Sequence, residues 1–368
     1  MRPLFQKVAI IGVGLIGGSL GMALYSRGLV EWVVGCDTDR ENLELAVELE
    51  AIHEAVGDIK EAVTAADLVV VAVPVGLTVD IIRNIVPFIK KGSIVIDVGS
   101  TKAHIVKQVN EIMPPGTYFV GGHPMTGAET AGVRGADRYL FENAVYILTP
   151  AEETDRVAVD RVTEMLTCLG SRVVEIDPEE HDLMVATVSH LPHLVATALV
   201  KTAGEIQQDH EELLMLAAGG FRDTTRVASG NPLMWKDICL TNKSNILAVL
   251  DRFAGVLQSI RQNVENCDDK SLQKEFEKAG EIRRSIPVKL RGYLPVAYEI
   301  VVTVPDRPGV IADLANCLGN VGININDIEI LRVREGEGGT IRLAFGSEEE
   351  QARAIEVLRQ NKIIVKKR

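Results

Sequence analysis

The feature that most constrains the fold of this 368-residue chain is a glycine pattern close to its start. Residues 7–11, KVAII, form an apolar, β-branched run that predicts a buried strand. The segment 12–17, GVGLIG, follows at once, and the helix-compatible stretch Ser19–Ser26 comes next. Because G-x-G-x-x-G here stands between a strand and a helix, it predicts a dinucleotide-binding turn. The alternative is a glycine-rich turn that binds no ligand.

Each glycine of this pattern has its own expected task. Gly12 permits a tight turn, Gly14 lets backbone N–H groups approach a pyrophosphate, and Gly17 lets the helix pack closely on the strand. The N-terminus of the helix then faces the phosphate charge. The residues of the turn expected to contact the cofactor are Gly12, Gly14, Leu15, Ile16 and Gly17.

An acidic residue at the end of the second apolar run indicates which dinucleotide binds. Asp37 closes the run VVGCD, 20 residues after Gly17. A carboxylate there accepts hydrogen bonds from the adenosine ribose and repels a 2′-phosphate, which favours NAD over NADP. Arg40 lies nearby and would soften this preference. Val73 and Pro74, at the end of a later apolar run, are expected to line the same site.

Apolar runs recur along the first half of the chain, with helix-compatible segments between most of them. Strands that are apolar on both faces and alternate with helices indicate a parallel sheet covered on both sides. Residues 1–176 are therefore expected to form an α/β domain with a Rossmann-type, doubly wound parallel sheet. Its expected strands after the first are 32–36, 68–73, 94–98, 119–121, 145–148 and 172–176.

Two further domains are expected after Asp177-Pro178. Residues 177–290 are rich in helix formers with apolar positions at helical spacing, and they predict an all-helical domain. A proline-flanked linker leads to residues 297–368, whose strand and helix patterns run βαββαβ. That order is typical of a ferredoxin-like module.

Charge and cysteine usage exclude several classes of function. The formal net charge is −12, so the chain has no overall attraction for nucleic acid or anionic lipid. Five scattered cysteines form no CxxC pair, which argues against a disulfide framework or a zinc cluster and favours a reducing, cytoplasmic location. No segment is expected to approach the run of about 20 apolar residues that spans a bilayer, so no membrane span is expected.

Several segments between residues 5 and 290 resemble the prephenate dehydrogenase family. They are DVGSTK at 97–102, GHPMTGAE at 122–129, EHD at 180–182 with SHLPH at 189–193, and FRDTTR at 221–226 followed by Met234-Trp235. Near the C-terminus, DRPGV at 306–310 with GINI at 322–325 resembles an ACT domain. Some bacterial members of the family combine these domains.

The resemblance implies an NAD-dependent oxidative decarboxylation of prephenate to 4-hydroxyphenylpyruvate, in tyrosine biosynthesis. Three alternatives stay open. The substrate could be arogenate, or both acids. A different Rossmann enzyme, acting on β-hydroxyacids, would need a lysine motif on the helical domain that we do not find. A protein of another class would be a non-catalytic sensor of NAD or an amino acid.

The resemblance assigns the proton chemistry to His123 and Ser100. An imidazole with an ordinary pKa near about 6.5 suits acceptance of the 4-hydroxyl proton. Ser100 follows an expected strand at the sheet edge where ligands bind, and its implied task is to orient His123 or to contact the hydroxyl and the nicotinamide. The structural alternatives are a histidine beside a turn and a serine that caps a helix.

The resemblance assigns the substrate side of the site to the helical domain, and it implies that Glu129 contacts either the substrate side or a neighbouring subunit. Arg226 offers a bidentate fork for a carboxylate, and Asp223 lies one turn earlier and could hold it. Trp235 would close the pocket, and His193 would lie near the substrate side chain. The alternatives are a solvated arginine and a core tryptophan, while His181 is expected to be an interface or structural residue. No metal site is expected.

The ACT-like module implies an amino-acid effector, with tyrosine the expected one because it is the pathway product. The residues expected to hold the effector are Asp306, Pro308, Gly309, Val310, Asn324 and Asn326. The alternative is a folding or dimerisation module without a ligand. Because a helical domain after a Rossmann unit commonly buries its apolar faces against a second chain, a homodimer is expected.

Overall fold

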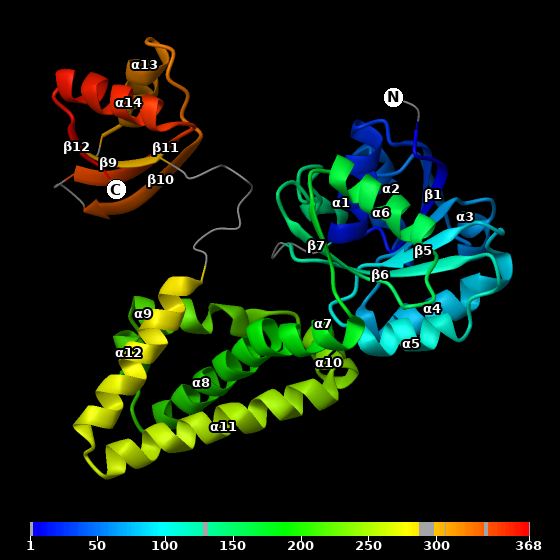
Figure 1. Ribbon diagram of the computed structural model, residues 1–368, viewed down its shortest axis with the longest axis horizontal. Coiled ribbons are helices and arrows are strands. Elements are labelled where there is room, and N and C mark those ends of the chain that lie inside the picture. Colours follow the sequence, from blue (N-terminus) through cyan, green and yellow to red (C-terminus); the bar gives the residue numbers. More distant parts are fainter. Residues whose placement is uncertain (1–2, 128–131, 287–297, 306, 335–337, 368) are drawn as a thin grey trace. The chain divides into compact units, whose positions relative to one another are not determined.

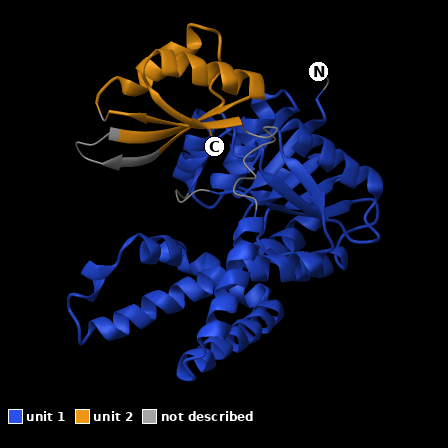
Figure 2. Cartoon of the chain, turned by 60° about the vertical axis from the view of Figure 1, so that its left-hand side comes forward, with its two compact units in different colours: residues 1–290 blue, residues 291–368 orange. Residues whose placement is uncertain are grey.

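A computed structural model describes the chain except for residues 1–2, 128–131, 287–297, 306, 335–337 and 368. The chain forms two compact units, Met1–Leu290 and Arg291–Arg368 (Figure 2). The first unit contains an α/β part, in which helices cover a β-sheet, and a part made of helices alone. The second holds a separate four-stranded sheet.

The first unit is built on an eight-stranded sheet with the order β3-β2-β1-β4-β5-β6-β7-β8. Neighbouring strands pair parallel, as expected, except for β6 and β7, which pair antiparallel, so β7 and β8 run opposite to the other six strands. The sheet also contains a short strand, β3, that the apolar runs did not predict. The strands are β1 (Phe5–Ile11), β2 (Val30–Cys36), β3 (Glu54–Val56), β4 (Leu68–Val71), β5 (Ile94–Asp97), β6 (Tyr118–Pro124), β7 (Val145–Thr149) and β8 (Arg172–Glu175).

Helices cover both faces of this sheet (Figure 1). One face packs against α1 (Leu15–Ser26), α2 (Arg40–Glu48) and α6 (Arg156–Cys168). The other packs against α3 (Ile59–Val63), α4 (Thr78–Ile85) and α5 (Ala103–Asn110). Because successive residues of each buried strand point to opposite faces, Val8 and Ile10 enter one core and Ala9 and Ile11 the other.

The rest of the first unit is helical. The helix α7 continues through a π-helical turn, Ala186–His190, into α8. The short 3₁₀ segments are η5 (Leu213–Leu216) and η6 (Arg226–Ser229). The helices are α7 (Pro178–Val185), α8 (Leu191–Gln207), α9 (Gly219–Thr225), α10 (Pro232–Thr241), α11 (Lys243–Glu265) and α12 (Asp269–Ser285).

The combined helix Pro178–Gln207 is the one helix in the described part of the chain that is long and apolar enough to cross a membrane, judged by length and composition. This differs from the expectation that no segment would qualify, because residues 183–200 contain no Asp, Glu, Lys or Arg. The same property fits a helix that packs against other protein, since its most apolar window is only 28% buried within one chain.

The second unit has the βαββαβ order expected from its sequence. Its antiparallel sheet has the strand order β10-β11-β9-β12, and α13 and α14 cover one face. Ser347 accepts a hydrogen bond from the Glu350 amide and caps the N-terminus of α14. The elements are β9 (Tyr298–Val304), α13 (Val310–Gly319), β10 (Asp327–Arg334), β11 (Gly338–Phe345), α14 (Glu348–Gln360) and β12 (Ile364–Lys367).

Candidate active site

A cleft of about 1230 Å³ opens at the carboxyl ends of β1 and β4, where the strand order of the sheet reverses direction. Open α/β sheets bind their ligands at such a switch point. The expected cofactor residues that line the cleft are Gly12, Gly14, Asp37, Arg40, Val73 and Pro74. Leu15, Ile16 and Gly17 form the first turn of α1 directly beside them.

The geometry of the three glycines fits a bound dinucleotide. Gly12 has a φ of 90°, and a Cβ there would lie 2.4 Å from the Ala72 carbonyl oxygen. A Cβ on Gly17 would lie 2.1 Å from the Gly12 oxygen, so this glycine permits the close contact of α1 with the turn. A Cβ on Gly14 would meet no atom within 4 Å. The backbone at Gly14 therefore faces open space, where a pyrophosphate could approach it.

Asp37 is held firmly at the mouth of the cleft. One carboxylate oxygen accepts a hydrogen bond of 2.8 Å from the Val13 amide, and the other accepts one of 3.0 Å from the Asp39 amide. Because an ionised carboxylate has about four acceptor positions, it can still receive ribose hydroxyls. Arg40 points into solvent and pairs loosely with Glu44 at 3.6 Å.

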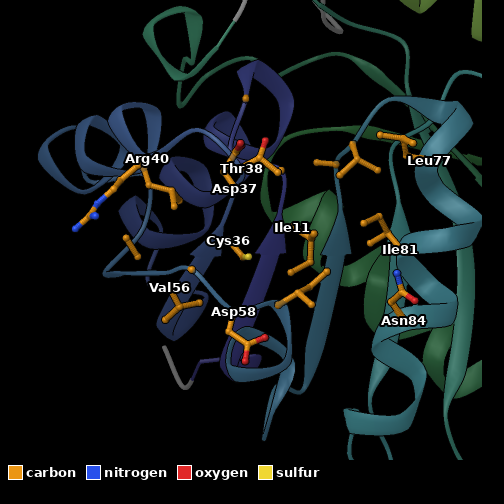
Figure 3. A pocket seen from close by; sticks show the side chains of 18 of the residues that line it. Ile11, Cys36, Asp37, Thr38, Arg40, Val56, Asp58, Leu77, Ile81 and Asn84 are labelled. Atoms are coloured by element: carbon orange, nitrogen blue, oxygen red, sulfur yellow. The ribbon is translucent and has the colours of Figure 1, made fainter.

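The cleft has further walls that the sequence did not single out. Figure 3 shows Thr38 beside Asp37 on one side and Leu77, Ile81 and Asn84 of the α4 region on the other. Asp58 follows β3 and lines the cleft as well. A three-residue strand leaves too weak a pattern to reveal Asp58. The position of α4 directly after β4 was a signal that could have identified the other wall.

His123 lies near the end of β6, and its principal partner is another histidine. Its Nδ1 is 2.8 Å from Nε2 of His181, which belongs to α7. His181 Nδ1 lies 2.8 Å from a carboxylate oxygen of Asp182. Both His181 and Asp182 are fully or almost fully buried. The structure thus brings the expected catalytic histidine into a chain of three side chains.

Ser100 lies just beyond β5, in the loop that leads to α5. Among the described residues its hydroxyl has no hydrogen-bond partner, and its catalytic role stays a prediction. The alternative that it caps α5 is wrong, because the capping position is Lys102. Asp182 supplies the acceptor instead, since its carboxylate receives the amides of Lys102 at 2.7 Å and Ala103 at 3.0 Å.

A buried ion pair supports the end of the sheet beneath His123. Lys102 and Asp97 are both inaccessible to solvent and bond to each other. Asp97 also accepts the amide of Gly122 at 3.1 Å, which fixes the residue before His123. Burial lowers the pKa of Lys102, and the Asp97 charge opposes that shift.

The electrostatic surroundings keep His123 neutral. Burial holds its pKa well below 6.5, and the nearby groups His181, Lys102 and His190 lower it further. Burial likewise lowers the pKa of His190 to about 4, against the opposing charge of Asp182. A neutral imidazole at pH 7 is the form that can accept a proton.

The residues expected on the substrate side gather in the helical layer. His193 stacks on Trp235, and His190 meets the same indole edge-on at 6.1 Å. Asn242 connects these groups to the His123 chain, because its amide donates to the Asp182 carbonyl oxygen at 2.7 Å and lies 3.3 Å from His190 Nδ1.

Arg226 begins η6, which packs against α8, and Asp223 lies in the last turn of α9. Both side chains are exposed in a single chain. Their roles in binding a carboxylate stay predictions. Glu129 lies outside the described residues. Within the described residues, no group of three or more His, Cys, Asp or Glu side chains is placed to hold a metal ion.

The second unit contains a smaller cavity of about 360 Å³ beside the start of α13. Three expected effector residues, Pro308, Gly309 and Val310, line it together with Arg307, Ile330 and Ile341. Asn324 and Asn326 do not line it, and they bond to each other at 2.8 Å. Asp306 lies outside the described residues.

Comparison with known families covers most of the chain. Residues 20–175 match the nucleotide-binding domain of prephenate dehydrogenase, and residues 177–278 match its dimerization domain. Residues 298–362 match the ACT domain.

Individual relatives agree with these matches. A prephenate dehydrogenase of Bacillus subtilis (strain 168) is 36% identical over 355 residues, which cover 96% of each protein. The crystal structure of the A. aeolicus prephenate dehydrogenase in complex with hydroxyphenyl propionate and NAD⁺ has a TM-score of 0.72 and 32% identity, and covers 77% of this chain and 98% of that one. The Synechocystis arogenate dehydrogenase has a TM-score of 0.68 and 30% identity, with 77% and 100% covered. The chain is an NAD-dependent dehydrogenase that belongs to the prephenate dehydrogenase family.

Proposed function

We propose that this chain oxidises and decarboxylates prephenate to 4-hydroxyphenylpyruvate in tyrosine biosynthesis. The observation that carries the proposal is the placement of His123, a histidine kept neutral by its surroundings, at the same edge of the sheet as a glycine-lined cleft. The similarity to the Bacillus subtilis prephenate dehydrogenase over almost the whole chain supports the same reaction.

The residues of the chain divide the chemistry as follows. Gly12, Gly14 and Asp37 of the cleft would hold NAD⁺, which would supply the acceptor for the hydride of the ring carbon that carries the 4-hydroxyl. His123 accepts the hydroxyl proton through the ring nitrogen that does not face His181. Arg226 holds a substrate carboxylate, and His193 and Trp235 form a flat aromatic wall next to the side chain. Loss of carbon dioxide makes the ring aromatic, which drives the reaction.

Substrate choice between prephenate and arogenate is the second part of the proposal. We favour prephenate because the Bacillus subtilis relative is similar over 96% of both chains. The Synechocystis arogenate dehydrogenase, at 30% identity, makes arogenate the runner-up. Initial rates of NADH formation at 340 nm with each acid, and with NAD⁺ and NADP⁺, decide between them. A kcat/KM for arogenate above that for prephenate would reverse our assignment.

Two substitutions test the residue roles. His123→Asn should lower kcat by about 10²- to 10⁴-fold, which is the usual contribution of a general base. Arg226→Ala should mainly raise KM for prephenate, while Arg222→Ala, an exposed arginine one turn earlier, serves as the matched control. Unchanged kinetics in both site variants would refute the site.

The second unit is proposed to bind tyrosine as a feedback effector in the cavity beside Gly309. An ACT domain is present, and tyrosine is the end product of the proposed pathway. Effector control requires tyrosine to bind two conformations unequally. Saturating tyrosine should therefore change prephenate kinetics and the thermal midpoint, and if neither changes, tyrosine is not the effector.

The proposed assembly is a soluble cytoplasmic homodimer formed through the helical layer. The match to a dimerization domain and the poor burial of Pro178–Gln207 within one chain support this arrangement. Sedimentation of the full chain at several concentrations tests it.

A further inference from the structure

His123 reaches its partners through a chain whose hydrogen-bond directions can be deduced. Asp182 already accepts two backbone amides, those of Lys102 and Ala103, at 2.7 and 3.0 Å. An ionised carboxylate only accepts hydrogen bonds. In its third contact, at 2.8 Å, the Nδ1–H of His181 must therefore be the donor. A neutral imidazole carries one N–H. The Nε2 of His181 therefore has a lone pair and no hydrogen.

The same reasoning continues to His123. The Nδ1 of His123 lies 2.8 Å from the bare Nε2 of His181, so the hydrogen between them belongs to His123. With its one N–H used there, the Nε2 of His123 is left as a lone pair. This is the tautomer that can accept a proton from a substrate hydroxyl.

We propose that His181 and Asp182 are positioning residues that fix His123 in the tautomer with an unprotonated Nε2. The proposal rests on the proposed function, because it explains how the assigned base is kept ready and adds no new reaction. When His123 takes the proton on Nε2, its Nδ1–H still donates to His181, and the carboxylate of Asp182 lies at the far end of the chain.

Burial makes this arrangement effective. His181 and Asp182 expose 0% and 1% of their surface, so water does not compete for their hydrogen bonds. Among the described residues, the charged or titratable groups that act on His123 are His181 of α7, Lys102 before α5 and His190 of the π-helical turn. Lys102 is neutralised by Asp97, which leaves Asp182 as the acceptor that directs the chain.

A purely structural role is the competing explanation, because Asp182 also caps α5. Variants of His181 separate the two explanations better than variants of Asp182. His181→Phe keeps a flat ring but removes the acceptor. His181→Gln places an amide oxygen near the position of Nε2 and keeps the acceptor. His104→Gln changes an exposed histidine on α5 and is the control.

The experiment combines kinetics with ¹⁵N NMR of the histidine rings in the full-length chain. Wild-type His123 should be protonated at Nδ1. His181→Phe should lower kcat by about 10- to 100-fold, as expected for an orphaned hydrogen bond, with KM values for NAD⁺ and prephenate changed by less than about twofold. In His181→Phe, the ¹⁵N signals of His123 should no longer show that the proton lies mainly on Nδ1. His181→Gln should recover most of kcat and retain the Nδ1–H signal, while His104→Gln should match the wild type.

Three results would overturn the proposal. These are a wild-type His123 protonated at Nε2, a His181→Phe variant with wild-type kcat, and a folded His181→Gln variant as slow as His181→Phe. If His181→Phe fails to fold, the wild-type spectrum and His181→Gln still decide the matter. Failure of the wild type to oxidise prephenate would refute the proposed function instead, since the tautomer is measured without turnover.

Discussion

The imidazole of His193 lies flat on the indole of Trp235, with ring centroids 3.6 Å apart and 9° between the ring planes. The loop at Gly230 holds this stack from one side, because a Cβ there would lie 2.4 Å from the indole nitrogen. His193 is only 7% exposed, and its Nδ1 has no hydrogen-bond partner among the described residues. The stack therefore fixes the orientation of a ring that the proposed substrate would meet.

Replacing Trp235 should disturb substrate binding more than the chemical step. Trp235→Leu removes the stack, whose aromatic contact is worth about 0.5–1.5 kcal/mol, so KM for prephenate should rise by up to about tenfold. Trp235→Phe should retain most of the affinity. The control is Trp32→Leu, which removes another tryptophan–histidine stack, that with His53 at 4.7 Å. Equal effects of Trp235→Leu and Trp32→Leu on KM would contradict the assignment.

Replacing each of two glycines of the cofactor turn with alanine should affect a different property, stability for one and NAD⁺ affinity for the other. Gly17→Ala forces a Cβ against the Gly12 oxygen, so the free energy of unfolding should fall by about 1–3 kcal/mol. Gly14→Ala meets no neighbouring atom, so the thermal midpoint should hold while NAD⁺ affinity falls. Thermal melts and NAD⁺ titrations of both variants provide the test. A Gly14→Ala protein that binds NAD⁺ normally would show that the pyrophosphate does not approach this backbone.

Asp37 should control the choice between NAD⁺ and NADP⁺. Asp37→Ser removes a charged acceptor worth about 1.5–3 kcal/mol, so kcat/KM with NAD⁺ should fall by about 10- to 100-fold. The penalty against a 2′-phosphate should be relieved at the same time, and the NAD⁺ to NADP⁺ ratio should drop. Asp58→Asn changes another carboxylate of the same cleft and should alter the ratio little. An unchanged ratio in Asp37→Ser would contradict the assignment.

Buried histidines should make folding stability depend on pH in a definite direction. The pKa of His123 is held well below 6.5, and that of His190 is lowered to about 4. Between about pH 4 and 6.5 the unfolded chain therefore binds protons that the folded chain does not. Stability is retained above pH 6.5 and is lost as the pH falls toward 4. Thermal midpoints measured from pH 7 to pH 5 should show this decline.

The variant His190→Gln isolates one of these contributions. It should flatten the decline of the thermal midpoint below pH 6.5, because one buried group no longer titrates. His210→Gln, which changes an exposed histidine, should leave the decline as it is. A His190→Gln protein with the wild-type slope would show that His190 is protonated equally in both states.

Local patterns predicted most of the fold. The glycine turn and the apolar strands depend on neighbouring residues, so the sequence displays them directly. The antiparallel pairing of β6 with β7 could not be predicted, since a strand that is apolar on both faces looks the same in either direction. Glu54–Val56 is a three-residue strand, too short to show an alternation.

The candidate site divides in the same way. Asp37 and the glycines follow from spacing along the chain, whereas the contact of His123 with His181 joins residues 58 positions apart. The bond from the Lys102 amide to Asp182 spans 80 positions. Such contacts depend on how α7 docks against the sheet, which no local pattern encodes. The bond from the Glu350 amide to Ser347, by contrast, spans only three positions and depends on the local sequence.

The poor burial of the helix Pro178–Gln207 makes the stability of the fold depend on the protein concentration. A lone copy exposes apolar side chains on Val188, Leu199 and Val200 to water. Every such contact that is closed by a second copy adds to the free energy of unfolding of both, so the melting temperature should climb as the protein is concentrated. The chain would then be less stable in a cell that makes little of it than in a cell that makes much.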